Sequence, residues 1–345
     1  MAGKLTVALA LLRVLLPEPV QRLLYAGRLP EVEGRRIDAS ARAVSDLVAA
    51  VRDPNTMPTL EQSRAQIAAM AAKFDQPCPA SVEKTDIHLP GAEGDRPARV
   101  YTPRGQDGDS LPTLLYLHGG GWVQGGIATH DGICGKLADW AGIRVISFDY
   151  RLAPEHRFPA APDDVLACYR ALVSGQTPLK IDPARLAVGG DSAGANLTAA
   201  LMHDLGAAGE ARPAAQLLIY PAVDARMTSA SMQALKDQPV LPLPRIRWYL
   251  DLYLPKDQDR LAPRVSPLLS PHLAGQPPAL IIPAGHDPLW NDGIGYAEAL
   301  RAAGVRVDLA PFPGQVHAFI SLTKVIPQGN AAIRQAADWL AKVVR

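Results

Sequence analysis

The sequence predicts an α/β fold, in which a mostly parallel β-sheet is flanked by helices and carries a helical cap. Short apolar strands alternate with helices from about residue 113 to the end of the chain, and this alternation is typical of parallel sheets with helices on both faces. The first 75 residues instead carry helical patterns only. In addition, residues 221–278 form a connection that is far longer than an ordinary crossover.

Length and charge narrow the possible architectures and partners. A chain of 345 residues is long for one domain and short for three. We therefore expect one α/β domain over residues 76–345, with a cap made by residues 1–75 and by an insertion over about residues 224–265. With a net charge of +1 and no run of lysine or arginine, the chain gives no electrostatic reason to expect a nucleic-acid partner.

The three cysteines, Cys78, Cys134 and Cys168, are scattered and odd in number. This pattern argues against a disulfide framework and favours a cytoplasmic location. No pair of cysteines has metal-ligand spacing, and no His-Glu-x-x-His motif occurs. We therefore expect neither a metal ion nor another cofactor.

The first helical pattern, residues 5–16, is almost entirely apolar. It is too short to span a bilayer, so we expect no stable membrane insertion and a helix on the protein's own surface that ends at Pro17. A signal peptide is the alternative, but Arg13 interrupts the apolar run and no small-residue cleavage site follows. Residues 38–52 and 59–74 predict two further helices.

The sheet is expected to begin with an antiparallel pair, residues 86–89 and 98–101, which flank a loop rich in turn residues. The parallel strands are expected at residues 114–117, 145–148, 186–188, 217–220, 279–282 and 305–309. The helices that follow them are expected at residues 131–141, 162–174, 193–205, 292–303 and 331–344. Within the long connection, residues 245–254 form an aromatic-rich helical segment. We expect it to join the N-terminal helices in a cap at the carboxyl ends of the strands.

The central motif is Gly-Asp-Ser-Ala-Gly at residues 190–194, where a buried strand turns directly into a helix. Small residues on both sides let the strand and the helix approach closely, and such a turn lifts the serine hydroxyl off the sheet edge. The motif therefore predicts Ser192 as a nucleophile. The alternative is a glycine-rich turn with an inert serine.

A second motif, His-Gly-Gly-Gly-Trp at residues 118–122, follows the first parallel strand. Three consecutive glycines favour a loop whose bare backbone N–H groups point into an open pocket. We expect the N–H groups of Gly119, Gly120 and Gly121, together with that of Ala193, to form an oxyanion hole. A flexible loop or a phosphate cradle is the alternative, although no Gly-Lys-Ser/Thr motif is present.

A serine nucleophile needs a base, and the base needs a carboxylate that orients it. In this topology the chain order is serine, acid, histidine. Asp287 directly follows the strand and turn over residues 279–286, and His317 is the only histidine downstream of it. The predicted triad is therefore Ser192, Asp287 and His317.

Several polar residues near these motifs are expected to have structural roles. His118 is expected to brace the glycine loop, and Asp191 and Asp292 to hold loops by hydrogen bonds. In the segment Tyr-Arg-Leu-Ala-Pro-Glu, which ends at Glu155, Arg151 and Glu155 could pair beneath the glycine loop. An exposed pair of little energetic value is the alternative.

Five motifs together resemble those of the hormone-sensitive-lipase-like family of α/β hydrolases. They lie at residues 118–122, 150–155, 190–194, 287–289 and 316–319. The resemblance covers about residues 85–345 and implies an eight-stranded sheet, a helical cap and serine esterase activity. It also implies that Ser192 is the nucleophile, His317 the base and Asp287 the acid, and it allows a homodimer formed through edge strands.

The predicted function is hydrolysis of short- to medium-chain acyl esters by a serine carboxylesterase. Trp122, Trp248 and Tyr249 are expected to line a closed, apolar substrate pocket. Two alternatives stay open: an amidase or deacetylase of small molecules with the same triad, and a small-ligand receptor on the same fold. A receptor can dispense with the base, whereas this sequence retains His317.

Overall fold

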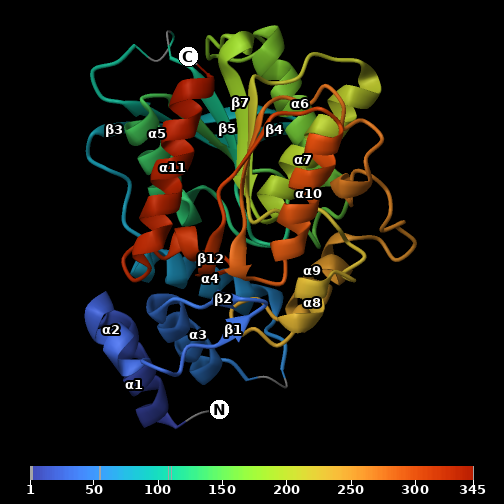
Figure 1. Cartoon of the computed structure of the whole chain (residues 1–345). Coiled ribbons are helices and arrows are strands. Elements are labelled where there is room, and N and C mark those ends of the chain that lie inside the picture. Colours follow the sequence, from blue (N-terminus) through green and yellow to red (C-terminus); the bar gives the residue numbers. More distant parts are fainter. Residues whose placement is uncertain (1–2, 54–55, 108, 110, 345) are drawn as a thin grey trace.

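An eight-stranded sheet forms the centre of the computed structural model, which describes residues 3–53, 56–107, 109 and 111–344 (Figure 1). β4 pairs antiparallel with β3 and with β6, and every other pair of neighbours in the order β11-β9-β8-β7-β5-β6-β4-β3 is parallel. The strands are β3 (Val82–Gly91), β4 (Gly94–Pro103), β5 (Thr113–Leu117), β6 (Arg144–Phe148), β7 (Leu186–Asp191), β8 (Ala215–Ile219), β9 (Ala279–Ile282) and β11 (Val307–Leu309). The predicted mostly parallel sheet and its antiparallel pair are confirmed.

Helices cover both faces of this sheet, as Figure 1 shows. They are α5 (Asp131–Ala141), α6 (Ala160–Ser174), α7 (Ala193–Ala208), α10 (Trp290–Ala302) and α11 (Pro327–Val343). Strand side chains alternate between the faces. In β5, Leu114 and Tyr116 join a buried cluster with α5 and α11, whereas Leu115 and Leu117 join one with α6 and α7.

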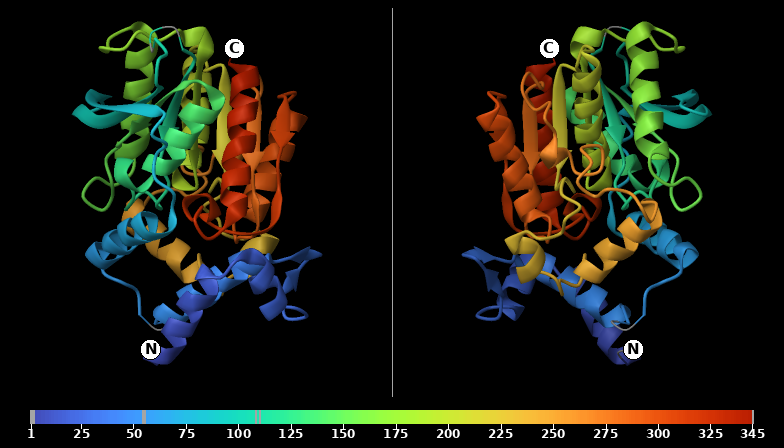
Figure 2. Two further views of the ribbon diagram at one scale, coloured as in Figure 1. Left: turned by 90° about the vertical axis from the view of Figure 1, so that its left-hand side faces the viewer. Right: turned by 90° about the vertical axis from the view of Figure 1, so that its right-hand side faces the viewer.

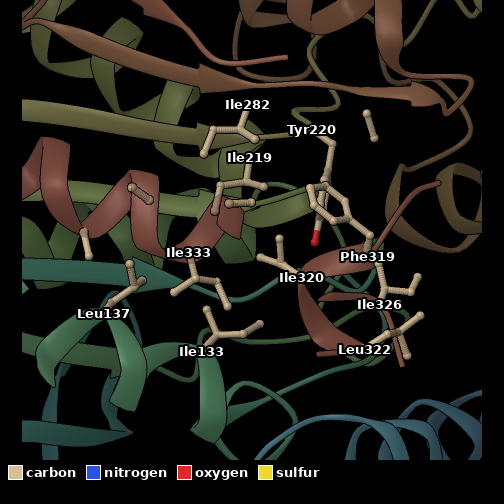
Figure 3. Close-up of a cluster of buried hydrophobic side chains, with 14 of the residues drawn as sticks. Ile133, Leu137, Ile219, Tyr220, Ile282, Phe319, Ile320, Leu322, Ile326 and Ile333 are labelled. Carbon is tan, nitrogen blue, oxygen red and sulfur yellow. The ribbon is translucent and has the colours of Figure 1, made fainter. Parts of the chain in front are cut away.

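Branched aliphatic side chains fill the space between the sheet and the helices α5 and α11 (Figure 3). Ile219 of β8 is the register partner of Ile282 of β9, and Ile133 of α5 and Ile333 of α11 lie in the same cluster. All four side chains are fully buried. Since one buried aliphatic side chain contributes about 1.5–3 kcal/mol, this layer firmly fixes the strands whose ends carry the site.

Helices from two distant parts of the chain gather at the carboxyl ends of the parallel strands (Figures 1 and 2). The N-terminal part supplies α1 (Lys4–Leu15), α2 (Glu18–Leu24), α3 (Ala39–Val51) and α4 (Leu60–Phe74). The long connection between β8 and β9 supplies α8 (Ala230–Ala234) and α9 (Leu243–Tyr253). Together they form a helical cap over that end of the sheet.

The first helix, α1, lies on α3 and buries Ala10 and Val14. Its other face exposes large apolar side chains, among them Leu5 and Leu12. Within the described residues, no helix combines the length and the apolar character that crossing a bilayer requires.

Four pieces of the structure are not predicted by the sequence patterns. They are α2, α8, the hairpin of β1 (Glu31–Val32) and β2 (Arg35–Arg36), and the small parallel sheet of β10 (Ala284–His286) and β12 (Phe312–Val316). The prolines that suggested a break before α2 occupy its N-cap and first turn, where proline is well tolerated. The short strands β10 and β12 contain glycine and proline, which mask a strand signal.

Candidate active site

Ser192 occupies the sharp turn between β7, which ends at Asp191, and α7, which begins at Ala193. Its backbone has φ 54° and ψ −114°, a conformation that costs energy in a residue with a side chain. A Cβ atom at Gly190 or at Gly194 would collide with the carbonyl oxygen of Leu117. The glycines of the motif are therefore required by the close packing of β7 and α7 on β5.

The structure brings together the three residues of the predicted triad. His317 Nε2 lies 2.9 Å from Ser192 Oγ, and His317 Nδ1 lies 2.6 Å from Asp287 Oδ2. Asp287 is fully buried, and its other carboxylate oxygen accepts a hydrogen bond from the N–H of Leu289 at 2.9 Å. This arrangement holds the imidazole between a carboxylate and a hydroxyl.

The small β10–β12 sheet sets the positions of the acid and the base. His286, the last residue of β10, is the register partner of Val316, the last residue of β12. Asp287 and His317 are the next residues along each strand. Because parallel strands that end in register place their next residues side by side, this sheet delivers the carboxylate to the imidazole.

The glycine loop lies beside Ser192, with Gly120, Gly121 and Trp122 at φ 129°, 61° and 62°. Among the described residues, the N–H groups of Gly120, Gly121 and Ala193 have no hydrogen-bond acceptor. The N–H of Gly119 instead donates to Asp191 Oδ1 at 3.0 Å. The prediction that Gly119 contributes to the oxyanion hole is therefore wrong, because its amide already serves to anchor the loop.

Asp191 is the anchor of that loop. Its carboxylate also accepts hydrogen bonds from Tyr116 Oη at 2.9 Å and Tyr220 Oη at 3.3 Å, and it lies 3.2 Å from His130 Nε2. Burial alone would raise the pKa of Asp191, but the charge of His130 and the hydrogen bonds outweigh burial and hold this pKa below its usual value. The same pairing raises the pKa of His130 against the effect of its own burial.

His118 and Asp292 have the structural roles that the sequence indicates. The His118 ring stacks on Tyr150 with 4.4 Å between centroids, and its Nδ1 lies 2.9 Å from the carbonyl oxygen of Gly119. Asp292 accepts hydrogen bonds from the N–H groups of Val223 and Asp224, each at 3.1 Å. Neither side chain competes with His317 as the base.

Arg151 and Glu155 do not pair with each other, so that prediction is wrong. Arg151 lies 2.9 Å from Asp164 and 2.5 Å from Glu93. Glu155 lies 2.7 Å from Arg64 of α4, whose Nε also donates to the carbonyl oxygen of Val123 at 2.8 Å. Arg64 therefore ties the cap to the glycine loop, a link that no local motif signals.

A cavity opens above Ser192 and His317 between the sheet ends and the cap. Trp122 and Tyr249 line it as predicted, and the Tyr249 ring lies directly against Gly121 of the glycine loop. Trp122 stacks on Tyr253 with 4.5 Å between centroids. Trp248 is not part of the lining, and the guanidinium of Arg245 lies 4.5 Å from the centroid of its ring. The predicted place of Trp248 in the pocket is therefore wrong.

A family model described as the alpha/beta hydrolase fold matches residues 114–321. The chain belongs to the α/β-hydrolase family. This membership confirms the fold class that the strand pattern and the motifs predicted.

The relatives of this α/β hydrolase include named ester hydrolases. The chain is 38% identical to carboxylic ester hydrolase LipN of Mycobacterium tuberculosis, over 92% of this chain and 85% of that protein. It is 41% identical to an ethyl acetate hydrolase of Pseudomonas putida, over 79% and 86% of the two chains. Among solved structures, an ester hydrolase from the Lake Arreo metagenome is 39% identical with a TM-score of 0.84, covering 88% of this chain and 98% of that chain.

Proposed function

We propose that this chain is a carboxylesterase that hydrolyses short- to medium-chain acyl esters through an acyl-enzyme on Ser192. The observation that carries the proposal is the 2.9 Å contact of Ser192 Oγ with His317 Nε2, beside three backbone amides without an acceptor among the described residues. The names of the relatives, which include a carboxylic ester hydrolase and an ethyl acetate hydrolase, support the substrate class.

In the proposed mechanism, His317 takes the hydroxyl proton as Ser192 Oγ attacks the carbonyl carbon of the ester. The N–H groups of Gly120, Gly121 and Ala193 stabilise the resulting oxyanion by hydrogen bonds. Asp287 accepts a hydrogen bond from the Nδ1–H of His317, which leaves Nε2 free to take the serine proton, and its negative charge stabilises the imidazolium that forms.

The tetrahedral intermediate then collapses, and His317 gives its proton to the departing alcohol. A water molecule attacks the acyl carbon while His317 takes one of its protons. When the bond to Ser192 Oγ breaks, that proton returns to the serine and the carboxylic acid leaves.

The shape of the cavity supports a preference for short acyl chains. Apolar side chains of the cap, such as Met70, Met232, Leu241 and Ile246, line the cavity together with Ser192, and an apolar cavity of limited size restricts the length of the chain it accepts. We expect a higher kcat/KM for butyrate and hexanoate esters than for long-chain triglyceride emulsions. The opposite order would contradict the proposed substrate size.

The direct test of the nucleophile is Ser192→Ala. This change removes the attacking oxygen, so hydrolysis of a short p-nitrophenyl ester should fall by about 10⁴-fold or more. Circular dichroism and thermal unfolding should show an intact fold. Turnover at the wild-type level would exclude Ser192 as the nucleophile.

Two further measurements separate the carboxylesterase from its alternatives. A fluorophosphonate probe should label wild type and not Ser192→Ala, whereas a pure receptor would leave both unlabelled. Comparison of one acyl group as an ester and as an anilide should favour the ester. Faster anilide cleavage would instead identify an amidase with the same triad.

A further inference from the structure

Two arginines lie in the cap wall of the cavity, Arg52 directly after α3 and Arg245 in α9. Arg245 is only 6% exposed, and Arg52 is half-buried. The two guanidinium groups lie close enough to influence each other. Burial and the charge of Arg245 both lower the pKa of Arg52.

The hydrogen bonds of both arginines go to neutral acceptors. Arg245 donates to Tyr249 Oη at 3.1 Å and to Ser63 Oγ at 2.6 Å. Arg52 donates to the backbone carbonyl oxygens of Pro239 at 2.5 Å and Val240 at 3.5 Å. Among the described residues, no carboxylate oxygen lies within 4.0 Å of a nitrogen of either guanidinium, so neither group forms an ion pair.

The acidic groups that line the same cavity have partners of their own. Asp191 lies 3.2 Å from His130, and Asp224 lies 2.8 Å from Arg226. Asp292 accepts two backbone hydrogen bonds, and burial raises its pKa well above the usual value. The two guanidinium charges are therefore not compensated by the acids of the cavity wall.

The remaining contacts of these arginines do not neutralise their positive charges. Arg245 lies over the rings of Trp248 and Tyr249, at 4.5 and 5.1 Å from the centroids, and such contacts are modest in energy. Burying a charge without a partner is costly. A bound anion would remove that cost, and the planar guanidinium fork matches a carboxylate.

We propose that Arg52 and Arg245 bind a carboxylate carried by the substrate, so that the enzyme prefers acidic esters such as half-esters of dicarboxylic acids. Tyr249 sets the distance between the arginines and the glycine loop. Its ring lies against Gly121, and its hydroxyl accepts from Arg245. The anion site thus lies about the length of one tyrosine side chain from the glycine loop. This proposal names the substrate class of the proposed carboxylesterase and rests on that function.

The test compares acidic and neutral esters of equal length. Monoethyl adipate is paired with ethyl hexanoate, which places the carboxylate on the acyl side. The ω-acetoxy derivative of valeric acid is paired with pentyl acetate, which places it on the alcohol side. We expect wild type to show a roughly 10- to 100-fold higher kcat/KM for the acidic member of at least one pair.

Substitution of the arginines should remove that preference. Arg245→Gln and Arg52→Gln should each lower the acidic-to-neutral ratio of kcat/KM by roughly 10-fold or more, mainly through KM. Arg245→Lys, which keeps the charge, should retain part of the ratio. The matched control is Arg247→Gln, because Arg247 is exposed on the same helix and should leave the ratio unchanged. Thermal unfolding identifies any variant that fails to fold.

A direct binding measurement completes the test. Adipate dianion should inhibit the hydrolysis of ethyl hexanoate competitively, and Arg245→Gln should weaken that inhibition. A wild-type enzyme that prefers the neutral member of both pairs and is not inhibited by adipate would overturn the proposal. Ser192→Ala separates a failure of this proposal from a failure of the proposed esterase function. Its loss of activity on all four esters would support the triad, whatever the acidic-to-neutral ratio of the wild-type enzyme is.

Discussion

Asp191 shows how one side chain beside the nucleophile can organise the whole site. Its carboxylate joins Tyr116 of β5, the N–H of Gly119, Tyr220 and His130. Gly119 and His130 line the cavity, and the Tyr220 ring lies 4.6 Å from the ring of His317. Asp191 therefore fixes the loop that carries two of the proposed oxyanion donors.

Replacement of this carboxylate should cost both stability and turnover. Asp191→Asn removes the charge that faces buried His130, so we expect a loss of about 3 kcal/mol in the free energy of unfolding. The loosened glycine loop should lower kcat by about 10-fold or more, with little change in KM. Urea unfolding and steady-state kinetics measure the two effects. An unchanged stability would contradict the importance of the buried pair.

The stability loss should depend on pH in a defined direction. The pKa of Asp191 is lowered in the folded protein, so its contribution is present above its unfolded pKa of about 3.9 and disappears as pH falls through the folded value. The pKa of His130 is raised, so its contribution is present below its unfolded pKa of about 6.5 and disappears as pH rises through the folded value. The difference between wild type and Asp191→Asn should therefore be largest between about pH 4 and 6.5.

At this scale, the sequence predicts residues whose chemistry depends on local motifs. Ser192, Asp287 and His317 follow from a turn motif, strand ends and chain order. Partners that come from remote segments do not follow. Arg64 reaches Glu155 across 91 positions, and a residue pair four apart in a loop, such as Arg151 and Glu155, carries no equivalent of the helical i,i+4 geometry.

The two-stranded β10–β12 sheet ends directly before the acid and the base. A Cβ atom at Gly285 would collide with the backbone of Pro313, so the strands pack more closely there than any other residue allows. This closeness determines how far Asp287 lies from His317. The site therefore depends on a small sheet whose sequence carries only a weak strand signal.

Gly285→Ala should therefore separate β10 from β12. We expect a loss of about 1–3 kcal/mol in stability and a drop in kcat of about 10- to 100-fold, because the carboxylate no longer holds the imidazole in position. Thermal unfolding and ester hydrolysis measure the two effects. Wild-type kcat in a folded variant would show that this spacing is not required.

A second glycine provides the control. Gly295 lies inside α10, and the nearest atom to an added Cβ is Leu268 Cδ2 at 3.9 Å. Gly295→Ala should raise stability by about 0.5–1 kcal/mol, because alanine favours the helix, and should leave kcat unchanged.

Long, periodic elements are the predictable part of this fold. The strands of the main sheet and the helices that cover it follow from apolar runs and from the helical period. The small elements fail for local reasons. β10 is three residues long, β12 contains Pro313 and Gly314, and the prolines before and within α2 resemble a break.

At the scale of the whole molecule, the N-terminal segment contacts β10 and β12, the strands that position the acid and the base. Arg35 Nε donates to the carbonyl oxygen of Gly285 at 2.9 Å, and the carbonyl oxygen of Arg35 lies 2.8 Å from His286 Nε2. The N–H of Asp38 donates to the carbonyl oxygen of Gly314 at 2.9 Å. Residues 35–38 thus contact both strands that position the acid and the base.

This coupling predicts that a residue of the N-terminal segment affects turnover. Arg35→Ala removes the bond to Gly285 and the stacking on Trp290, 4.6 Å from the guanidinium, so we expect kcat to fall about 10-fold with a smaller change in KM. Arg36→Ala is the matched control, because that neighbouring side chain is 70% exposed and should change neither constant. Equal kinetics for the two variants would contradict the coupling.

The contacts of residues 35–38 also bear on where this enzyme can be cut or recombined. The span matched by the family model, residues 114–321, leaves out the segment that supports the loops bearing the carboxylate and the imidazole. A chimaera that exchanges the hydrolase core between two homologous esterases would therefore also need the N-terminal segment that matches this core. The smallest transferable unit of this catalyst begins well before its first recognisable motif.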